Sequence, residues 1–233
     1  MAFTTDVPVR IGSGFRTASR LQQSLSAVVE KKTLLWMAAR TPKWISSDHL
    51  TALGFGAQFL AGVGYALAGW NKQFLWLASL FIAVNWLGDS LDGTLARFRN
   101  QQRPRYGFYV DHMADTFGAA FLMGGLALSG FLHWQVAAGM LVGFLILSIE
   151  SYLTTYTIGK FHMSYALFGP TEIRILLIIG NVALLRWPRG HLAGHTFPLF
   201  DIGGIVAITG MLIMAVVATA MHTTQLYREE RIL

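Results

Sequence analysis

The chain has 233 residues, of which 54% are hydrophobic and only 13% are charged. Soluble globular chains carry about 25% charged residues, so this composition excludes an ordinary soluble domain and predicts a single polytopic membrane bundle. The net charge of +6 is explained better by membrane topology and anionic headgroups than by nucleic acid. The chain has no cysteine, which excludes disulfides and thiolate metal sites.

The first segment, residues 1–45, is basic and only partly apolar, and we expect it at the cytoplasmic membrane surface. It lacks an early apolar core, so no cleavable signal peptide is expected. Between about residues 14 and 41, basic and apolar side chains alternate, which predicts an amphipathic interfacial helix; a solvated basic tail is the alternative. The apolar residues at helical spacing are Leu21, Leu25, Val28 and Val29.

Six stretches within residues 46–225 approach the length of about 20 apolar residues that a membrane-spanning helix needs. We therefore predict an all-α integral membrane protein with six transmembrane helices, and a short cytoplasmic tail over residues 226–233. Ser46 or Ser47 can cap the first span, and the short fifth span is expected to begin nearer Leu167. The predicted spans are residues 50–69, 74–95, 108–128, 134–156, 173–185 and 202–221.

Basic residues predict the orientation of these spans. Seven precede the first span, and Arg97, Arg99, Arg103 and Arg105 lie between the second and third. The opposite side holds only Lys72, Arg186 and Arg189. Because basic loops stay inside, both termini are expected in the cytoplasm of a multi-pass protein, with a bacterial inner membrane as the expected location.

Four aspartates, at positions 89, 92, 111 and 115, interrupt the second and third spans. Intramembrane carboxylates are costly and usually mark a functional site. Each pair is three or four residues apart and shares a helix face, and the short connection makes the two spans antiparallel neighbours. Four converging carboxylates repel one another unless cations lie between them, and all-oxygen ligation favours Mg²⁺, Mn²⁺ or Ca²⁺.

Small residues and an arginine accompany the aspartates. Gly93, Ala96 and Gly107 leave room for a ligand, and Arg97 offers a fork suited to phosphate. Together these features predict a site for a metal-bound diphosphate, in which one carboxylate can act as general base. The structural alternative is a set of buried acids paired with nearby arginines.

From Asp89 to Asp115 the chain reads D-x2-D-G-x2-A-R-x9-G-x3-D-x3-D, which resembles the signature of the CDP-alcohol phosphotransferase family. The resemblance implies that residues 46–225 form a catalytic domain. It would transfer a substituted phosphate from a CDP-linked alcohol, with CDP-diacylglycerol preferred, to a small alcohol acceptor and release CMP. It also implies an association with membrane lipid and a homodimer.

The resemblance also implies roles for the motif residues. Two Mg²⁺ or Mn²⁺ ions would be held by Asp89, Asp92 and Asp111. Asp115 would be the catalytic base and would also touch a metal ion. The residues implied to contact the cytidine diphosphate are Gly93, Ala96, Arg97 and Gly107.

The acceptor stays open at this stage. A phosphorylated acceptor would suit Arg105, Lys160 and Arg174, whereas a cationic amino alcohol would suit Glu172, Glu150 and Tyr152. Glu172 and Arg174 are also explained by a helix start after Pro170, and Glu150 by an interhelical hydrogen bond. His191 and His195 lie in what reads as an irregular, glycine-containing outside loop, and two histidines are too few for a metal site.

Two other functions are weighed. A CDP-choline or CDP-ethanolamine donor with diacylglycerol as acceptor would use the same motif. A divalent-cation transporter could also line a pathway with aspartates, but it does not explain why the glycines and Arg97 accompany them. CMP release separates the transferase from the transporter, and any turnover would exclude an inactive scaffold.

Overall fold

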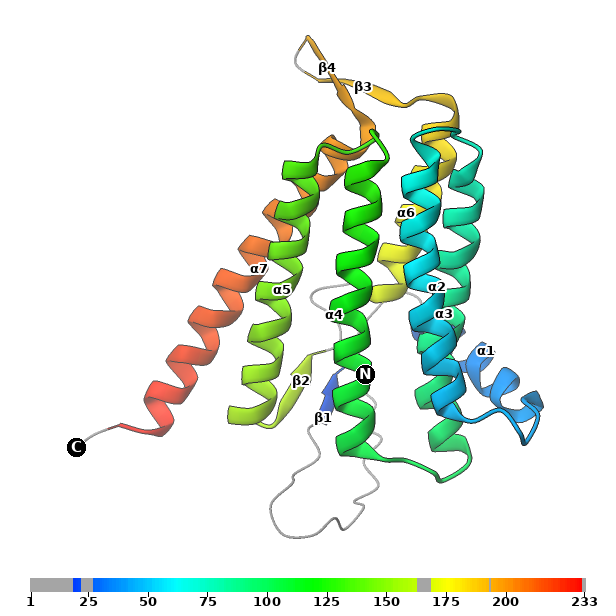
Figure 1. Ribbon diagram of the computed structural model, residues 1–233. Coiled ribbons are helices and arrows are strands. Elements are labelled where there is room, and N and C mark those ends of the chain that lie inside the picture. Colours follow the sequence, from blue (N-terminus) through cyan, green and yellow to red (C-terminus); the bar gives the residue numbers. More distant parts are fainter. Residues whose placement is uncertain (1–18, 22–26, 163–168, 193, 232–233) are drawn as a thin grey trace.

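The computed structural model describes residues 19–21, 27–162, 169–192 and 194–231. These residues form seven helices and two small two-stranded sheets (Figure 1). The protein is therefore mostly helical, as the all-α prediction expects, and the strands, of three or four residues each, are an addition that was not predicted. The elements are β1 (Ser19–Leu21), α1 (Ala27–Arg40), α2 (Ser47–Ala68), α3 (Phe74–Phe98), α4 (Pro104–Leu128), α5 (Trp134–Thr157), β2 (Lys160–His162), α6 (Pro170–Arg186), β3 (Arg189–Leu192), β4 (His195–Pro198) and α7 (Leu199–Glu229).

Four of the helices, α2, α3, α5 and α7, are long and apolar enough to cross a membrane. The two other predicted spans correspond to α4 and α6, which do not meet that description. Helix α4 carries Asp111 and Asp115, and α6 has 17 residues, which span ~26 Å against a hydrocarbon core of ~30 Å. The structure therefore supports four of the six predicted spans; α4 falls short because of its charged residues and α6 because of its length.

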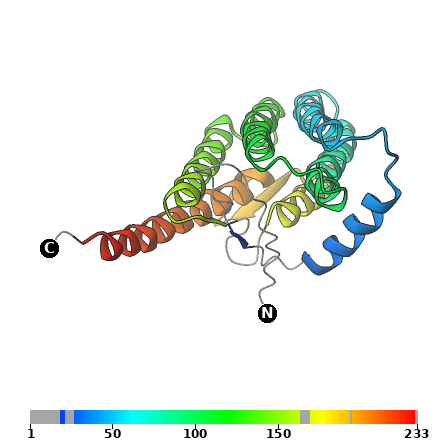
Figure 2. The same ribbon diagram turned by 90° about the horizontal axis from the view of Figure 1, so that it is seen from below.

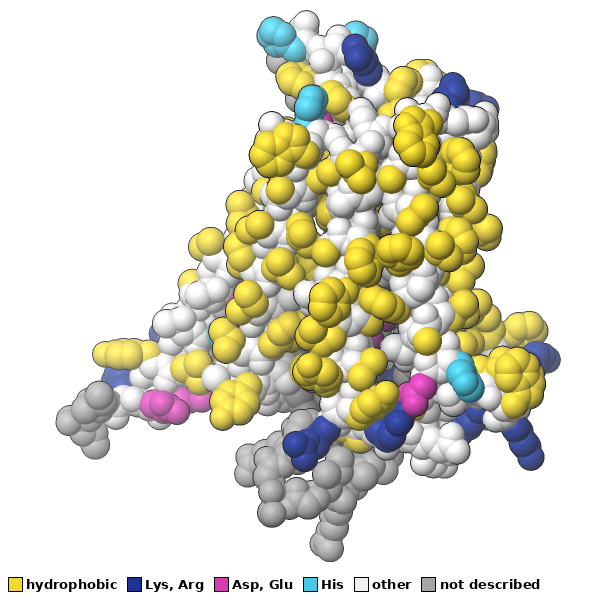
Figure 3. Space-filling model, in the orientation of Figure 1, with side chains coloured by type: hydrophobic (Ala, Val, Ile, Leu, Met, Phe, Trp, Pro, Cys, Tyr) yellow, Lys and Arg dark blue, Asp and Glu magenta, His cyan; other side chains and the backbone are white. Residues whose placement is uncertain are grey.

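The long helices form one bundle, in which each packs on its neighbours along an arc (Figure 2). Helix α2 packs against α3 and α4, while α4 packs on α5, α5 on α7 and α3 on α6. Glycines bring the backbones of α2 and α4 into contact: a Cβ on Gly125 would lie 2.0 Å from the Gly62 carbonyl oxygen. Hydrophobic side chains cover the middle of the face seen in Figure 3, and Lys and Arg side chains gather toward both ends.

A buried polar chain crosses the core of the bundle. Tyr65 Oη donates to Asn181 Oδ1 over 2.8 Å, and Asn181 Nδ2 donates to Ser79 Oγ over 3.0 Å. Buried polar groups need such partners, so this chain of hydrogen bonds fixes α2, α6 and α3 relative to one another.

The described residues of the predicted N-terminal helix are helical only in α1. It begins at Ala27, and Ser19–Leu21 forms β1, which pairs in parallel with β2. Leu25 lies outside the described residues. The helix packs on α3 at the outside of the bundle (Figure 2), and its Leu34 and Ala38 are buried with Leu50 of α2. These two side chains contact the protein rather than lipid, so the position of α1 in the headgroup layer stays a prediction.

At the opposite end of the bundle, the loop predicted to be irregular is a hairpin. Strands β3 and β4 pair antiparallel, with Leu192 opposite His195. Gly194 has φ +79°, a backbone conformation that favours glycine and permits the tight turn. His191 and His195 therefore lie on neighbouring strands; no described group of three acidic or histidine side chains there could hold a metal ion.

Candidate active site between helices α2, α3 and α4

Two glycines set the contact on which the site is built. A Cβ on Gly88 would lie 2.5 Å from the Gly54 backbone nitrogen, and one on Gly54 would lie 3.1 Å from the Asp89 nitrogen. Helices α2 and α3 therefore touch backbone to backbone where the aspartates begin. This approach lets Thr51 Oγ1 of α2 donate to Asp92 Oδ2 of α3 over 2.6 Å.

Helix α4 adds the second pair of aspartates. Asp89, Asp92, Asp111 and Asp115 all line one cavity of about 10 Å³ between α2, α3 and α4. That volume accommodates about one water-sized sphere. The structure thus gathers the four aspartates in one place; their chemical roles stay predictions. The other lining residues are Thr51, Gly54, Phe55, Gln58, Asn85 and Ala114.

Three of the four aspartates, Asp89, Asp92 and Asp111, have polar contacts with neighbouring groups. Arg174 Nη2 of α6 forms an ion pair with Asp89 Oδ2 at 2.7 Å, and their side chains are 13% and 25% exposed. Asp92 accepts from Thr51 and from the Gly93 backbone nitrogen. His112 Nδ1 lies 3.5 Å from Asp111 Oδ2. Arg174 beside Asp89 and Arg97 near Asp92 supply two positive charges against four carboxylates, which leaves an excess of negative charge that attracts cations.

The donor set suits a divalent cation in kind, because hard cations prefer carboxylate oxygen. Among the described residues, however, no three acidic or histidine side chains are arranged as a ready ligand set. One oxygen of Asp89 is engaged by Arg174, and both oxygens of Asp92 accept hydrogen bonds. Each carboxylate oxygen has two lone pairs, so a cation can bind these aspartates while the contacts remain.

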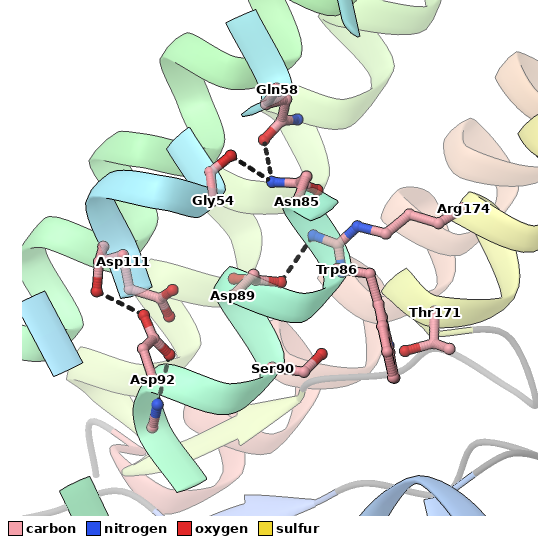
Figure 4. A network of polar contacts seen from close by, with 12 residues as sticks. Gly54, Gln58, Asn85, Trp86, Asp89, Ser90, Asp92, Asp111, Thr171 and Arg174 are labelled. Carbon is pink, nitrogen blue, oxygen red and sulfur yellow. Dashed lines mark hydrogen bonds and ion pairs between the residues drawn. The ribbon is translucent and has the colours of Figure 1, made fainter. Parts of the chain in front are cut away.

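Asn85 and Gln58 also line the cavity and were not predicted. Asn85 Nδ2 donates to the Gly54 carbonyl oxygen over 3.0 Å and to Gln58 Oε1 over 3.2 Å (Figure 4). Their spacing carries a signal that could have found them. Asn85 is one helical turn before Asp89, and Gln58 is two turns after Thr51, so each shares a face with a cavity residue.

The comparison with known families decides the identification. The model of the CDP-alcohol phosphatidyltransferase family matches residues 44–223, which is most of the chain. The chain belongs to this family. Members of the CDP-alcohol phosphatidyltransferase family use a CDP-linked donor and an alcohol acceptor.

Two curated proteins are similar over shorter stretches. An archaetidylinositol phosphate synthase of Pyrococcus horikoshii is 31% identical over 113 residues, which cover 48% of this chain and 53% of that protein. A phosphatidylinositol phosphate synthase of Cutibacterium acnes is 35% identical over 85 residues, covering 36% of this chain and 38% of that protein. The matches thus span about half, or less, of these relatives' lengths.

The CDP-alcohol phosphatidyltransferase motif also contains the residues predicted to contact the cytidine diphosphate. A Cβ on Gly93 would lie 3.3 Å from Arg97 Nη1, so the exposed guanidinium lies over this glycine. A Cβ on Gly107 would meet nothing within 4 Å. Ala96 is half-buried on α3. Packing within the described residues therefore does not require glycine at position 107, which favours the interpretation that it leaves room for a ligand.

The predicted acceptor residues separate into two groups. Arg174 joins the aspartates through its ion pair with Asp89. Glu172 Oε2 accepts from the Gly169 backbone nitrogen over 2.9 Å, as the helix-start interpretation expects. Arg105 is exposed in the first turn of α4, and Lys160 lies in β2 with its side chain outside the described set.

Glu150 and His112 have structural contacts. His222 Nδ1 of α7 donates to Glu150 Oε1 over 2.5 Å, and Thr154 Oγ1 donates to the same oxygen over 2.9 Å. This is the interhelical bond that was one of the two interpretations of Glu150. The His112 ring stacks on Phe108, with 4.1 Å between ring centroids.

Proposed function

We propose that this chain is a membrane enzyme of phospholipid synthesis that transfers a substituted phosphate from CDP-diacylglycerol to an alcohol acceptor and releases CMP. The observation that carries the proposal is the gathering of all four motif aspartates around one cavity. Membership in the CDP-alcohol phosphatidyltransferase family supports the same reaction.

The aspartates would hold two divalent ions, Mg²⁺ or Mn²⁺, as the family generally depends on such metals. Asp89, Asp92 and Asp111 are the proposed ligands, and Asp115 would share one ion. When bound, the ions would neutralise the diphosphate and stabilise CMP as the leaving group.

Asp115 is the proposed general base. Its carboxylate would take the proton of the acceptor hydroxyl, and the resulting oxygen would attack the donor phosphorus while the bond to CMP breaks. Arg97, with its guanidinium over Gly93, would bind the diphosphate through paired hydrogen bonds. Gly93, Ala96 and Gly107 would let the donor approach the backbones of α3 and α4 closely.

We propose a phosphorylated acceptor of the inositol phosphate type. Arg174 supports this choice, because a guanidinium beside the reacting carboxylates can exchange its bond to Asp89 for a bond to an acceptor phosphate. Arg105 and Lys160 would add positive charge. The two similar proteins are named as synthases of archaetidylinositol phosphate and of phosphatidylinositol phosphate, and these product names support the same acceptor.

The proposed topology has six spans over residues 46–225, with α4 and α6 crossing alongside the four apolar helices. The place of α4 and α6 among the four apolar helices supports this (Figure 1). Both termini, α1 and the active site would face the cytoplasm of a bacterial inner membrane. We also propose a homodimer, as the family resemblance implies.

The test is CMP release by the purified protein with CDP-diacylglycerol, Mg²⁺ or Mn²⁺ and one acceptor at a time. Release with inositol phosphate, but not with free inositol, serine or glycerol phosphate, is expected. Release with a different acceptor would replace the acceptor proposal and keep the reaction. No release with CDP-diacylglycerol, but release with CDP-choline or CDP-ethanolamine and diacylglycerol, would reverse the donor assignment. Metal flux without CMP release would favour the transporter.

A further inference from the structure

We propose that Glu30 of α1 is a positioning residue that fixes the start of α6, and with it Arg174, against Asp89. The kinetic consequence of this inference rests on the proposed function, in which Arg174 binds the acceptor. The N-terminal segment would then help to hold the acceptor-binding side of the site in place. Glu30 stands outside the aspartate motif, and its role follows from three contacts.

One oxygen of the Glu30 carboxylate joins three elements. Oε1 accepts from Trp86 Nε1 over 3.2 Å and from Ser90 Oγ over 3.2 Å, both on α3. The same oxygen accepts from Thr171 Oγ1 of α6 over 2.9 Å. Hydrogen bonds to an ionised carboxylate are stronger than neutral ones, so this oxygen links α1, α3 and α6 at one point.

The link lies beside the ion pair of the site. Ser90 follows Asp89 directly, and Thr171 lies one helical turn before Arg174. Figure 4 shows Trp86 and Thr171 close together between α3 and α6, next to the Arg174 side chain. The carboxylate therefore bonds to both helices that carry the ion pair, and its loss frees the first turn of α6 to move relative to α3.

Burial argues against a solvent-facing role for Glu30. Its second oxygen, Oε2, is buried and has no hydrogen-bond partner among the described residues. A glutamate in the first turn also favours the helix dipole, but it could do so from an exposed position. Burial of a carboxylate is unfavourable unless its bonds compensate, so the three donors account for its place.

The backbone supports the same role. β1 pairs in parallel with β2, the last described element before α6, which begins at Pro170. The N-terminal segment thus contacts β2, which follows α5, through β1, and the first turn of α6 through Glu30. Lys160 lies in β2 and Arg174 in α6, so two of the three proposed acceptor contacts are on elements that this segment touches.

The kinetic test compares Glu30→Ala and Glu30→Gln with Glu230→Ala, which removes an exposed acid near the C-terminus. Glu30→Ala should raise the KM for the acceptor about tenfold and leave the KM for CDP-diacylglycerol nearly unchanged. Glu30→Gln should fall between Glu30→Ala and the parent, and Glu230→Ala should match the parent. Equal loss for both substrates, or no change, would overturn the proposal.

A distance measurement tests the positioning without turnover. The parent chain has no cysteine, so Lys32→Cys on α1 and Ile175→Cys on α6, both exposed, can carry spin labels. Glu30→Ala should broaden or shift the distance distribution, and Glu230→Ala should not. If Glu30→Ala does not fold, Thr171→Val should give the same broadening and Thr171→Ser should restore the parent distribution. An unchanged distance distribution in the variant overturns the proposal. If the distribution broadens but the parent protein releases no CMP, the positioning role is upheld and only the proposed function is refuted.

Discussion

Replacing Gly88 by alanine tests whether backbone contact between α2 and α3 sets the active site. The added Cβ would lie 2.5 Å from the Gly54 nitrogen and 2.6 Å from the Leu50 carbonyl oxygen. These are backbone atoms, so the clash cannot be relieved by a change of side-chain rotamer. Moving from 2.5 Å to an ordinary contact of 3.4 Å requires the helices to separate locally by 0.9 Å.

A shift of this size acts on the site more than on the fold. Overpacking costs about 1–3 kcal/mol of stability. Misplacing catalytic groups by ~1 Å can cost about 100-fold in rate. Asp89 follows Gly88 directly, and Asp92 bonds to Thr51 across the same contact, so both carboxylates would move relative to α2. We expect kcat to fall about 100-fold while the protein still folds.

The assay is CMP release, with thermal unfolding in the same detergent as the measure of folding. Gly56→Ala is the control, because it adds a Cβ to α2, the other helix of this contact, at a position where nothing lies within 4 Å. It should keep parent activity and stability. If Gly88→Ala folds and retains kcat within about threefold of the parent, the helix contact does not position the carboxylates and the reasoning is wrong.

Further predictions concern the individual groups. Asp115→Asn should abolish CMP release and largely spare CDP-donor binding; equal loss of both would count against the general-base role. Arg97→Lys should raise the donor KM about tenfold, since a point charge replaces the fork, and an unchanged donor KM would remove Arg97 from the diphosphate site. Arg174→Gln should raise the KM for a phosphorylated acceptor more than the donor KM; a shift confined to the donor would place the acceptor elsewhere. Chelation should abolish CMP release, and added Mg²⁺ or Mn²⁺ should restore it; turnover that persists after full chelation would refute metal dependence.

The gathering of the aspartates could be predicted because it depends on local geometry. Residues three or four apart share a helix face, and the connection between α3 and α4 is short. The capping of α2 was also local: Ser46 Oγ accepts from the His49 backbone nitrogen over 3.3 Å, as one of the two predicted caps. In both cases the partners are close in sequence.

The missed features depend on contacts between distant parts of the chain. The partners of Glu30 are 56, 60 and 141 positions away, and neither its own turn nor its neighbours indicate them. Strand β1 forms only because β2 lies beside it, so the apolar spacing around Leu21 read as helix. The close approach at Gly54 and Gly88 likewise needed the packing of α2 on α3, because glycine alone does not identify its neighbour.

Because the aspartate cavity is small, the residues that would carry out the reaction and those that would contact the lipid tails lie in different places. A space of about 10 Å³ admits an ion or a water molecule, but not a nucleotide or an acyl chain. Under the proposed function, the body of the donor would therefore lie outside it, against the flanks of the helices, with only the reacting phosphate near the carboxylates. Substitutions on those flanks can then alter which tails are accepted while the aspartate cluster stays the same.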